Sequence, residues 1–572
     1  MASKQDMMNR VAAVAGYNSF NDMFKEYFLP IGVTVILTSI IIPWVMAVPW
    51  WTGLVIAFIG VGFIVGYPYS QYTQMKQSIE RNLHYFITYA GTISTVDIPR
   101  TKLFRKISEN ENFGYISDVF GRIQYLAKDW NLGYAKATRE MSRKVPSPIL
   151  ADFLDRLAVA LDFGEELNVF LEEEQGSIME DFRVEYEKSL ETIELLQDTF
   201  VALSISFSFL LGTSLLAPLL LNVQITTLLP FAIGFILLID IGLIFAVRSY
   251  IPTDRLIRRF DPANKDMQRV FNAFIVTAAA GIVLLAILYF ATPLPFLLIL
   301  AISVTPLAFP GFLALQLENK VMRRDKEFPI YSRVLGSAIE VRDGAVVSAL
   351  KSTQVHDFGA LDDISVHLYR RLRIGSDRWD SWYFFAKESG STLISNFSKI
   401  FSESVYMGGN SQRIGEIVSE NMQELLSLRK LRSQLANGLR GSFYGTLIGL
   451  SSVIYITAKV AELLIGIFNQ PLGTEGTQQF DFTSTIIPQA QSIDFQMVFF
   501  YIGLLIVVHS VASSFIMKAI DGGSWYAATI DFIIMIWIGA LLSVFLPVII
   551  DGLLPGIQEF GVNATQNATA AG

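Results

Sequence analysis

Stretches of apolar residues, each about as long as a membrane-crossing helix, recur along this chain. A helix needs about 20 predominantly apolar residues to cross the hydrocarbon core of a bilayer. Nine stretches meet this requirement, so we expect an all-α polytopic membrane protein with about nine transmembrane helices. The predicted spans are 29–48, 50–67, 200–221, 228–248, 271–292, 295–317, 442–467, 496–517 and 525–550.

The basic residues indicate which ends of these helices face the cytoplasm. Of the 44 Lys and Arg residues, 42 fall in polar stretches that share one side of the membrane with the N-terminus. The segment 468–495 and the tail 551–572, on the opposite side, contain none. Because Lys and Arg accumulate on the cytoplasmic side, we expect a multi-pass protein of the cell membrane with a cytoplasmic N-terminus and an external C-terminus.

Two long polar blocks, 68–199 and 318–441, lie on the predicted cytoplasmic side. Apolar residues recur within them at helical spacing, as at Phe153, Leu157 and Leu161. We therefore predict that each block forms a cytoplasmic helical bundle. The first block is acidic, with 22 acids against 15 bases, whereas the second is slightly basic, with 15 against 18.

The chain also repeats itself. Gly91 and Gly336 are 245 residues apart, Gly164 and Gly408 are 244 apart, and the spans after the two blocks keep about this offset. This favours two parallel repeats, each with its own cytoplasmic helical bundle, followed by an added last span. The predicted order is a cytoplasmic N-terminal segment (1–28), two spans (29–67), bundle 1 (68–199), two spans (200–248), a basic loop (249–270), two spans (271–317), bundle 2 (318–441), three spans (442–550) and an external tail (551–572).

The sequence lacks the motifs of the common catalytic and cofactor sites. There are no cysteines, no Gly-x-x-x-x-Gly-Lys-Ser/Thr loop, no His-Glu-x-x-His pair and no Gly-x-Ser-x-Gly turn. We therefore expect no enzyme activity, no cofactor and no metal site. A net charge of −8 also argues against a nucleic-acid partner.

Two turns carry a family resemblance. FGEEL at 163–167 and MGGNS at 407–411 each lead into a long charged helix that continues into a span. In this the chain resembles the F family of type II secretion, the inner-membrane platform proteins of type IV filament machines. Bacterial members show Gly-Glu-x-x-Gly-x-Leu in this turn. Here Gly164 starts the pattern without its second glycine, and Gly408 and Gly409 keep only the glycines.

The resemblance implies a function and partners. Two polar blocks and nine spans look most like the archaeal branch, in particular the platform of the archaellum (the archaeal flagellum), which takes part in its assembly and rotation. Such a platform would couple a hexameric secretion ATPase to the insertion of filament subunits (archaellins or pilins) and would act as a homo-oligomer in the lipid membrane. The platform of an adhesive type IV pilus is an alternative. A secondary transporter with parallel repeats is a more distant one.

Charged residues beside the spans are candidate contacts for the ATPase or for anionic lipid. Basic residues next to a span often bind the anionic inner leaflet, and they could equally dock an acidic ATPase surface. On the first bundle, two acids follow the turn glycine. The candidates are Arg255, Arg258, Arg259, Arg323, Arg324, Glu165 and Glu166.

Four ionisable residues are predicted to lie within the membrane. Asp240 and His509 each stand six residues after a glycine in spans that the repeat makes equivalent, so they are expected at the same depth. Lys459 and Glu462 are three residues apart on one helix and could pair. Charges inside a bilayer are costly. These residues therefore either line a functional polar seam or are neutralised by local partners.

Overall fold

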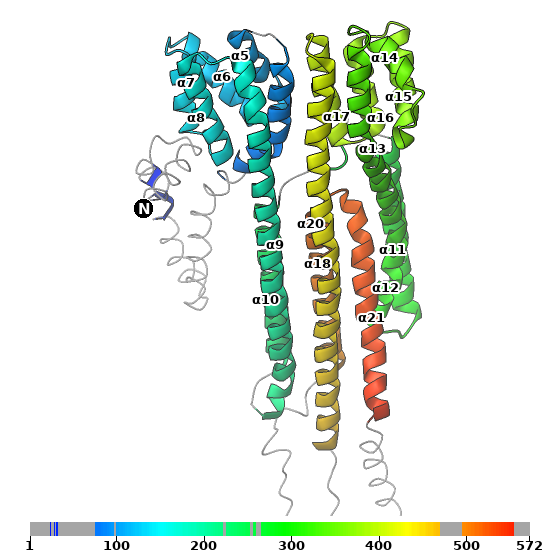
Figure 1. Ribbon diagram of the computed structural model, residues 1–572. Helices are drawn as coiled ribbons and strands as arrows, with labels where there is room; N and C mark the ends of the chain where they lie inside the picture. The colour runs from blue at the N-terminus through cyan, green and yellow to red at the C-terminus, as the bar shows by residue number, and fades with distance from the viewer. Residues whose placement is uncertain are drawn as a thin grey trace, which may run out of the picture. The chain divides into compact units, whose positions relative to one another are not determined.

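The structure is a computed structural model. It describes residues 75–96, 99–220, 225–251, 255–258, 265–468 and 495–553, with a few positions before residue 75. Every regular element in these ranges is a helix (Figure 1), which confirms the predicted all-α class. The predicted spans 29–48 and 50–67 lie outside the described residues, apart from 30–32.

Contacts between elements divide the chain into two compact units. The first, here called the head unit, comprises Met1–Lys188, Pro252–Asp254 and Arg323–Leu428. The second, here called the span unit, comprises Ser189–Ile251, Arg255–Met322 and Arg429–Gly572. Most of both polar blocks therefore belongs to one unit, and the predicted spans after residue 199 belong to the other.

The first half of the head unit is a bundle of short helices. They are a helix over 75–94, α5 (Arg100–Ser108), η2 (Glu111–Phe113), α6 (Tyr115–Lys128), α7 (Tyr134–Ser142), α8 (Pro148–Phe163) and the beginning of α9 (Leu167–Leu220). Pro148 is the first residue of α8, and its ring holds φ close to the helical value there. Phe86, Phe104, Phe120 and Phe153 form its buried aromatic core, with ring centroids 5.3–5.6 Å apart in the contacting pairs.

The second half has the same kind of construction. It contains the end of α13 (Ala308–Glu340), α14 (Val346–Thr353), η4 (Gly359–Leu361), α15 (Asp362–Arg373), α16 (Arg378–Ser389), α17 (Thr392–Tyr406) and the beginning of α18 (Ser411–Phe468). The Asp377 carboxylate caps α16 by accepting hydrogen bonds from two backbone N–H groups at 2.8 and 3.0 Å. Tyr331 and Phe385 stack in its core.

The two halves of the head unit share buried polar contacts. Ser404 Oγ donates to Thr92 Oγ1 at 2.9 Å, and Asn421 Nδ2 donates to Thr88 Oγ1 at 2.9 Å. These four side chains are buried, and buried polar groups are stable only when they are paired. The two predicted bundles are thus joined in one compact unit, an association that the sequence did not predict.

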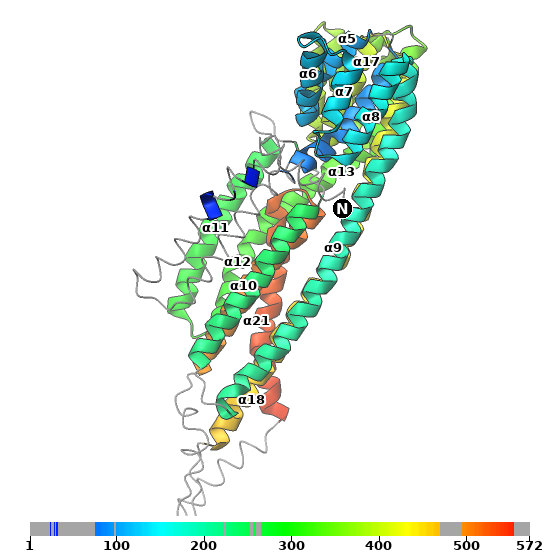
Figure 2. The ribbon, with the colours of Figure 1, turned by 90° about the vertical axis from the view of Figure 1, so that its left-hand side faces the viewer.

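The span unit contains the long apolar helices. They are the rest of α9, α10 (Ile225–Tyr250), α11 (Lys265–Ala291), α12 (Phe296–Val304), η3 (Thr305–Leu307), the beginning of α13, the rest of α18, α20 (Phe495–Asp521), η6 (Trp525–Ala527) and α21 (Ala528–Leu553). Helix α20 packs against α10 and α21, and α12 packs against α11 and α21. Figure 2 shows α11, α12 and α21 running alongside one another.

Six of the described helices are long and apolar enough to cross a membrane. They are Leu167–Leu216, Asp266–Ala291, Phe296–Glu340, Ser411–Leu464, Phe495–Asp521 and Trp525–Leu553. Each contains all or most of one predicted span, and α10 is helical across the predicted span 228–248. The protein is therefore a multi-pass membrane protein. The count of nine spans and the parallel repeat stay predictions.

Candidate functional site

The glycines of the two family turns have the backbone conformation for which glycine is suited. Gly164 ends α8 with φ 75°, and Gly408 follows α17 with φ 88°. Residues with a side chain rarely adopt this left-handed conformation. Gly409 is needed for a different reason, because a Cβ there would lie 2.6 Å from Thr95 Oγ1 and 2.8 Å from Val96 Cγ2. The second turn therefore packs closely on the first half of the head unit.

The acids beside the first turn lie on the surface of the head unit. Glu165 and Glu166 are exposed, and Phe163 next to them is 86% exposed. Arg100 donates a hydrogen bond to the backbone carbonyl of Glu165 at 2.9 Å, which holds the turn against α5. Both carboxylates can therefore contact a partner without any rearrangement of the turn.

The two arginines at the start of the second block have different surroundings. Arg323 is exposed. Arg324 is half-buried, and its guanidinium donates hydrogen bonds to the backbone carbonyls of Glu388 (2.8 Å) and Ser389 (3.0 Å). These carbonyls end α16, where a cation is favourable. Arg324 thus holds the head unit together, whereas the side chain of Arg323 is open to a partner.

The basic loop belongs to the span unit where it is described. Arg255 is exposed and Arg258 is half-buried, while Arg259 lies outside the described residues. Arg429 on α18 approaches the backbone carbonyl of Arg255 at 3.5 Å. The loop is thereby held beside α18.

Asp240 on α10 and His509 on α20 lie in contact. Asp240 Oδ1 is 3.2 Å from His509 Nδ1, and both residues are at most 2% exposed. The ring of Phe200 stacks on the imidazole with centroids 6.0 Å apart, and Ser513 Oγ lies 3.5 Å from Nε2. Asp240 Oδ2 has no hydrogen-bond partner among the described residues. The two predicted intramembrane groups therefore form one buried acid–imidazole pair able to share a proton.

Lys459 and Glu462 also lie in contact. Lys459 Nζ is 3.1 Å from Glu462 on the same helix, α18, and 3.4 Å from Asp551 on α21. Asp551, the third residue of this ion-paired cluster, was not among the predicted site residues. The lysine charge is thus neutralised by two carboxylates, and it connects the ends of two helices.

A larger ion network was not predicted. Lys518 Nζ on α20 lies 3.0 Å from the Glu318 carboxylate on α13 and 3.4 Å from Asp521. Arg440 on α18 reaches Asp521 at 2.9 Å and Asp531 on α21 at 3.4 Å. Four helices of the span unit are therefore linked at one level. The available signal was a set of charges just outside the predicted apolar stretches, with Asp531 inside the last one, but charge alone did not reveal their partners.

The turn between α20 and α21 completes this network. Arg432 on α18 donates to the backbone carbonyls of Ala519 and Ile520, two of the last carbonyls of α20. The Glu318 carboxylate accepts the backbone N–H of Ser524. Any side chain at Gly523 would collide with that carboxylate. This network, here called the ion clamp, fixes α13 and α18 to the α20–α21 turn.

The charged side chains of the span unit mainly link its helices to one another. Among the described residues, no three His, Asp or Glu side chains are grouped closely enough to hold a metal ion. The polar groups of the span unit are instead engaged mainly with one another, in pairs that connect different helices. These features define a polytopic α-helical membrane protein with a helical head unit.

Comparisons with known proteins agree with this class. Residues 86–214 match the family Type II secretion system (T2SS), protein F. The chain is 30% identical over 546 residues to Flagella accessory protein J of Methanocaldococcus jannaschii, covering 93% of this chain and 96% of the relative. It is 27% identical over 549 residues to Flagella accessory protein J of Methanococcus voltae, covering 93% and 97%. No solved structure matches the chain.

The chain belongs to the family of the Flagella accessory protein J. The likeness extends over nearly all of both chains, so it includes both polar blocks and the predicted spans. The secretion-family match includes Gly164 and the first part of α9, which confirms the family inferred from the FGEEL turn.

Proposed function

We propose that this protein is the membrane platform of an archaeal type IV filament machine, the archaellum. In this role the head unit receives conformational change from a hexameric secretion ATPase. The span unit passes that change to filament subunits as their hydrophobic helices leave the bilayer. The names of the two relatives favour the archaellum over an adhesive pilus.

The continuity of three helices carries this proposal. The boundaries between head and span units fall at Lys188/Ser189, Met322/Arg323 and Leu428/Arg429, inside α9, α13 and α18 respectively. The backbone hydrogen bonds of a helix join each turn to the next, and the one interior proline of α13, Pro329, lies within the head unit and not at the boundary. Twisting or tilting a helix on one side of a boundary therefore moves the other side. Movement imposed on the head unit would therefore reach the apolar helices directly.

The ion clamp supports the same role. It fixes α13 and α18 to the α20–α21 turn through buried charges, and breaking one partner of a buried ion pair costs about 3–5 kcal/mol. Two of the three connecting helices would thus move α20 and α21 with them. The energy for such movement comes from the partner, because the chain has no phosphate-binding loop and is proposed to be non-catalytic.

The orientation and the oligomeric state belong to the proposal. The one-sided distribution of basic residues supports a head unit in the cytoplasm, where an ATPase can reach it. We also propose a homo-oligomer, because several copies of this chain around the filament axis would offer equivalent surfaces to the subunits of a hexameric ATPase ring. The exposed Glu165, Glu166 and Arg323 of the head unit are the charged groups that we propose for docking.

Deletion of the gene in its native cell tests the function. We expect the deletion strain to lose swimming and archaella, while unassembled filament subunits accumulate in the membrane. Adhesive pili should be retained. Re-expression of the intact chain should restore both swimming and filaments. Loss of adhesive pili with archaella retained would instead assign the platform to the pilus, and retention of both filaments would refute the proposal.

A further inference from the structure

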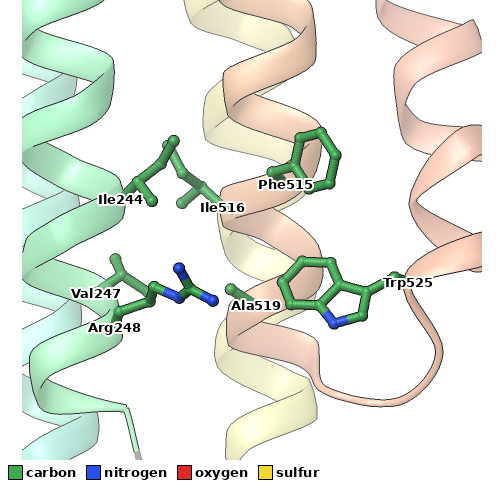
Figure 3. A pocket seen from close by; sticks show the side chains of 7 residues that line it. All are labelled: Ile244, Val247, Arg248, Phe515, Ile516, Ala519 and Trp525. Carbon is green, nitrogen blue, oxygen red and sulfur yellow. The ribbon is translucent and has the colours of Figure 1, made fainter.

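A groove lies between α10, α20 and η6 in the span unit. It has a volume of about 290 Å³ and is lined by Ile244, Val247, Arg248, Phe515, Ile516, Ala519 and Trp525. Figure 3 shows the Arg248 guanidinium reaching from α10 toward Ala519 and Trp525. Six of the seven lining residues are apolar or aromatic, so this groove combines a hydrocarbon surface with the side chain of one arginine.

The groove is open to the surroundings. Phe515 is 47% exposed and Trp525 is 48% exposed. Arg248 is also exposed. In a membrane-crossing helix, exposed apolar side chains face the hydrocarbon of lipid. A ligand could therefore enter sideways from the bilayer, with no need to cross the interior of the protein.

The position along the helices places the groove at the edge of the bilayer. Arg248 is two residues before the end of α10, Ala519 is two residues before the end of α20, and Trp525 follows the intervening turn. Trp is enriched where hydrocarbon meets the polar headgroups, and Arg there attracts anionic lipid. The charged part of the groove is thus at headgroup level, and Ile244 and Phe515 are one turn deeper.

We propose that this groove binds one anionic phospholipid. The guanidinium of Arg248 would hold the phosphate, for which its planar fork of donors is well suited. A hydrocarbon chain would lie along Ile244, Ile516 and Phe515. The proposal goes beyond the platform function. It requires only that these helices cross a membrane.

The size and chemistry of the groove favour a lipid over another helix. A helix with its side chains is about 10 Å wide, which is broad for a space of this volume, whereas part of one narrower hydrocarbon chain could lie in it beside a phosphate. A free phosphate ion would make no use of the apolar lining. The bound lipid would join α10 to the α20–α21 turn.

Lipid retention by the intact protein tests the proposal. The full-length chain, purified in a neutral detergent, is titrated with phosphatidylglycerol, and the bound lipid is counted by native mass spectrometry. We expect one tightly retained phosphatidylglycerol and at least tenfold weaker retention of phosphatidylcholine. Tenfold corresponds to about 1.4 kcal/mol, which is roughly the contribution of one hydrogen bond to a charged group. Arg248→Gln should lower phosphatidylglycerol retention by about the same factor, while Arg248→Lys should restore part of it.

Two further variants separate the groove from general surface charge. Ala519→Phe fills the space between α10 and Trp525, and it should abolish tight retention with the Arg248 charge still present. Arg269→Gln is the matched control, because Arg269 is an exposed arginine near the start of α11 and outside the groove. It should bind like the wild type. Circular dichroism of each variant shows that the helices are intact.

Several outcomes would overturn the proposal. Equal retention of both lipids would show that charge is not recognised, and equal losses in the Arg248 and Arg269 variants would show diffuse attraction. Competition by millimolar inorganic phosphate would indicate a free-anion site. A disulfide between two copies carrying Phe515→Cys, in a chain without other cysteines, would show that a second copy covers the groove.

Discussion

At the scale of single residues, the Asp240–His509 pair is the most unusual feature of the span unit. An isolated charge at the centre of a bilayer costs at least about 2.5–3.5 kcal/mol, whereas two groups in contact can share a proton. We therefore expect the two residues to act as one unit. Residues in direct contact commonly show interaction energies of about 0.5–3 kcal/mol in double-mutant cycles.

The cycle is made with Asp240→Asn, His509→Asn and the double variant. Each single change should lower the thermal unfolding midpoint and filament assembly, and the double variant should be no worse than the poorer single one. Membrane abundance, measured by immunoblot, shows that all three are inserted. Losses that add would mean that the residues are stabilised independently despite their 3.2 Å separation.

The half-buried side chain of Glu80 in the head unit should make the free energy of unfolding depend on pH. Burial raises the pKa of Glu80 to about 7 from 4.5; Lys76 opposes this shift and Glu185 adds to it. Between these pH values the folded state holds a proton that the unfolded state has lost. Stability therefore falls as pH rises from about 4.5 to about 7.

Glu80→Gln should remove this decline, because the amide is neutral throughout. The variant should match the wild type near pH 4.5 and exceed its unfolding free energy by on the order of 2 kcal/mol at pH 8. The readout is the thermal midpoint of the full chain in detergent, measured from pH 4.5 to 8. Glu173→Gln, at an exposed position of α9, is the control. Identical pH profiles for Glu80→Gln and the wild type would contradict the assignment.

At the scale of helices, Arg323 is the better probe of ATPase docking. Reversing Arg324 would disrupt its bonds to the end of α16, so any loss of binding would be ambiguous. Arg323→Glu should weaken binding of the partner ATPase about threefold to tenfold at low salt. The difference should shrink as salt rises, because exposed charge pairs are screened.

Lys351→Glu supplies the matched control, since Lys351 is exposed at another position of the head unit. It should bind the ATPase like the wild type. Binding is measured on the full-length chain in nanodiscs with purified ATPase. A Lys351 variant as weak as the Arg323 variant would show that docking depends on total charge and not on this position.

Sequence reasoning succeeded where the physical signal is local. Hydrophobic length identified six spans after residue 199 that the structure contains as helices long and apolar enough to cross a membrane, and the turn glycines Gly164 and Gly408 have the left-handed conformations that glycine suits. It also placed Asp240 and His509 at one depth, but their contact depends on α10 packing against α20. Nothing in the local sequence records which helices become neighbours.

The ion clamp shows this limit most clearly. Lys518 pairs with Glu318, 200 residues away, and Arg440 with Asp531, 91 residues away. Lys518, Glu318 and Arg440 each look like an ordinary charge at the end of a span, and Asp531 looks like a lone acid within one. The same limit hid the difference between Arg323 and Arg324, which are adjacent in sequence and are distinguished by their neighbours in the fold.

At the scale of the whole molecule, several contacts join positions that the predicted repeat makes equivalent. Gln197 bonds to Ser442, 245 residues later, and Gln175 bonds to Asn421, 246 residues later. Asp240 and His509, which the repeat also aligns, are in contact. Residues on a two-fold axis meet their own counterparts. Within each unit, these contacts are therefore what two repeats arranged around a local two-fold axis would produce.

The orientation in the membrane is tested with single cysteines, which the cysteine-free chain permits. A membrane-impermeant thiol reagent applied to intact cells should label cysteines at 480 and 565. It should not label cysteines at 130 and 380 until the cells are opened. Labelling with the reverse pattern would invert the orientation and leave the head unit out of reach of a cytoplasmic ATPase.

The central claim, that continuous helices carry movement from the head unit to the span unit, is tested most directly by softening α9 just beyond the unit boundary. Glu191, Glu194 and Asp198 are exposed there. Changing all three to Ala or all three to Gly removes the same charges, but each Gly weakens the helix by about 1 kcal/mol relative to Ala.

The measurement is the number of assembled filaments per cell at equal membrane abundance and equal ATPase binding. The triple Ala variant should assemble filaments nearly as well as the wild type, and the triple Gly variant should assemble at least about fivefold fewer. Equal assembly by the two variants would contradict the claim that α9 acts as a stiff connection.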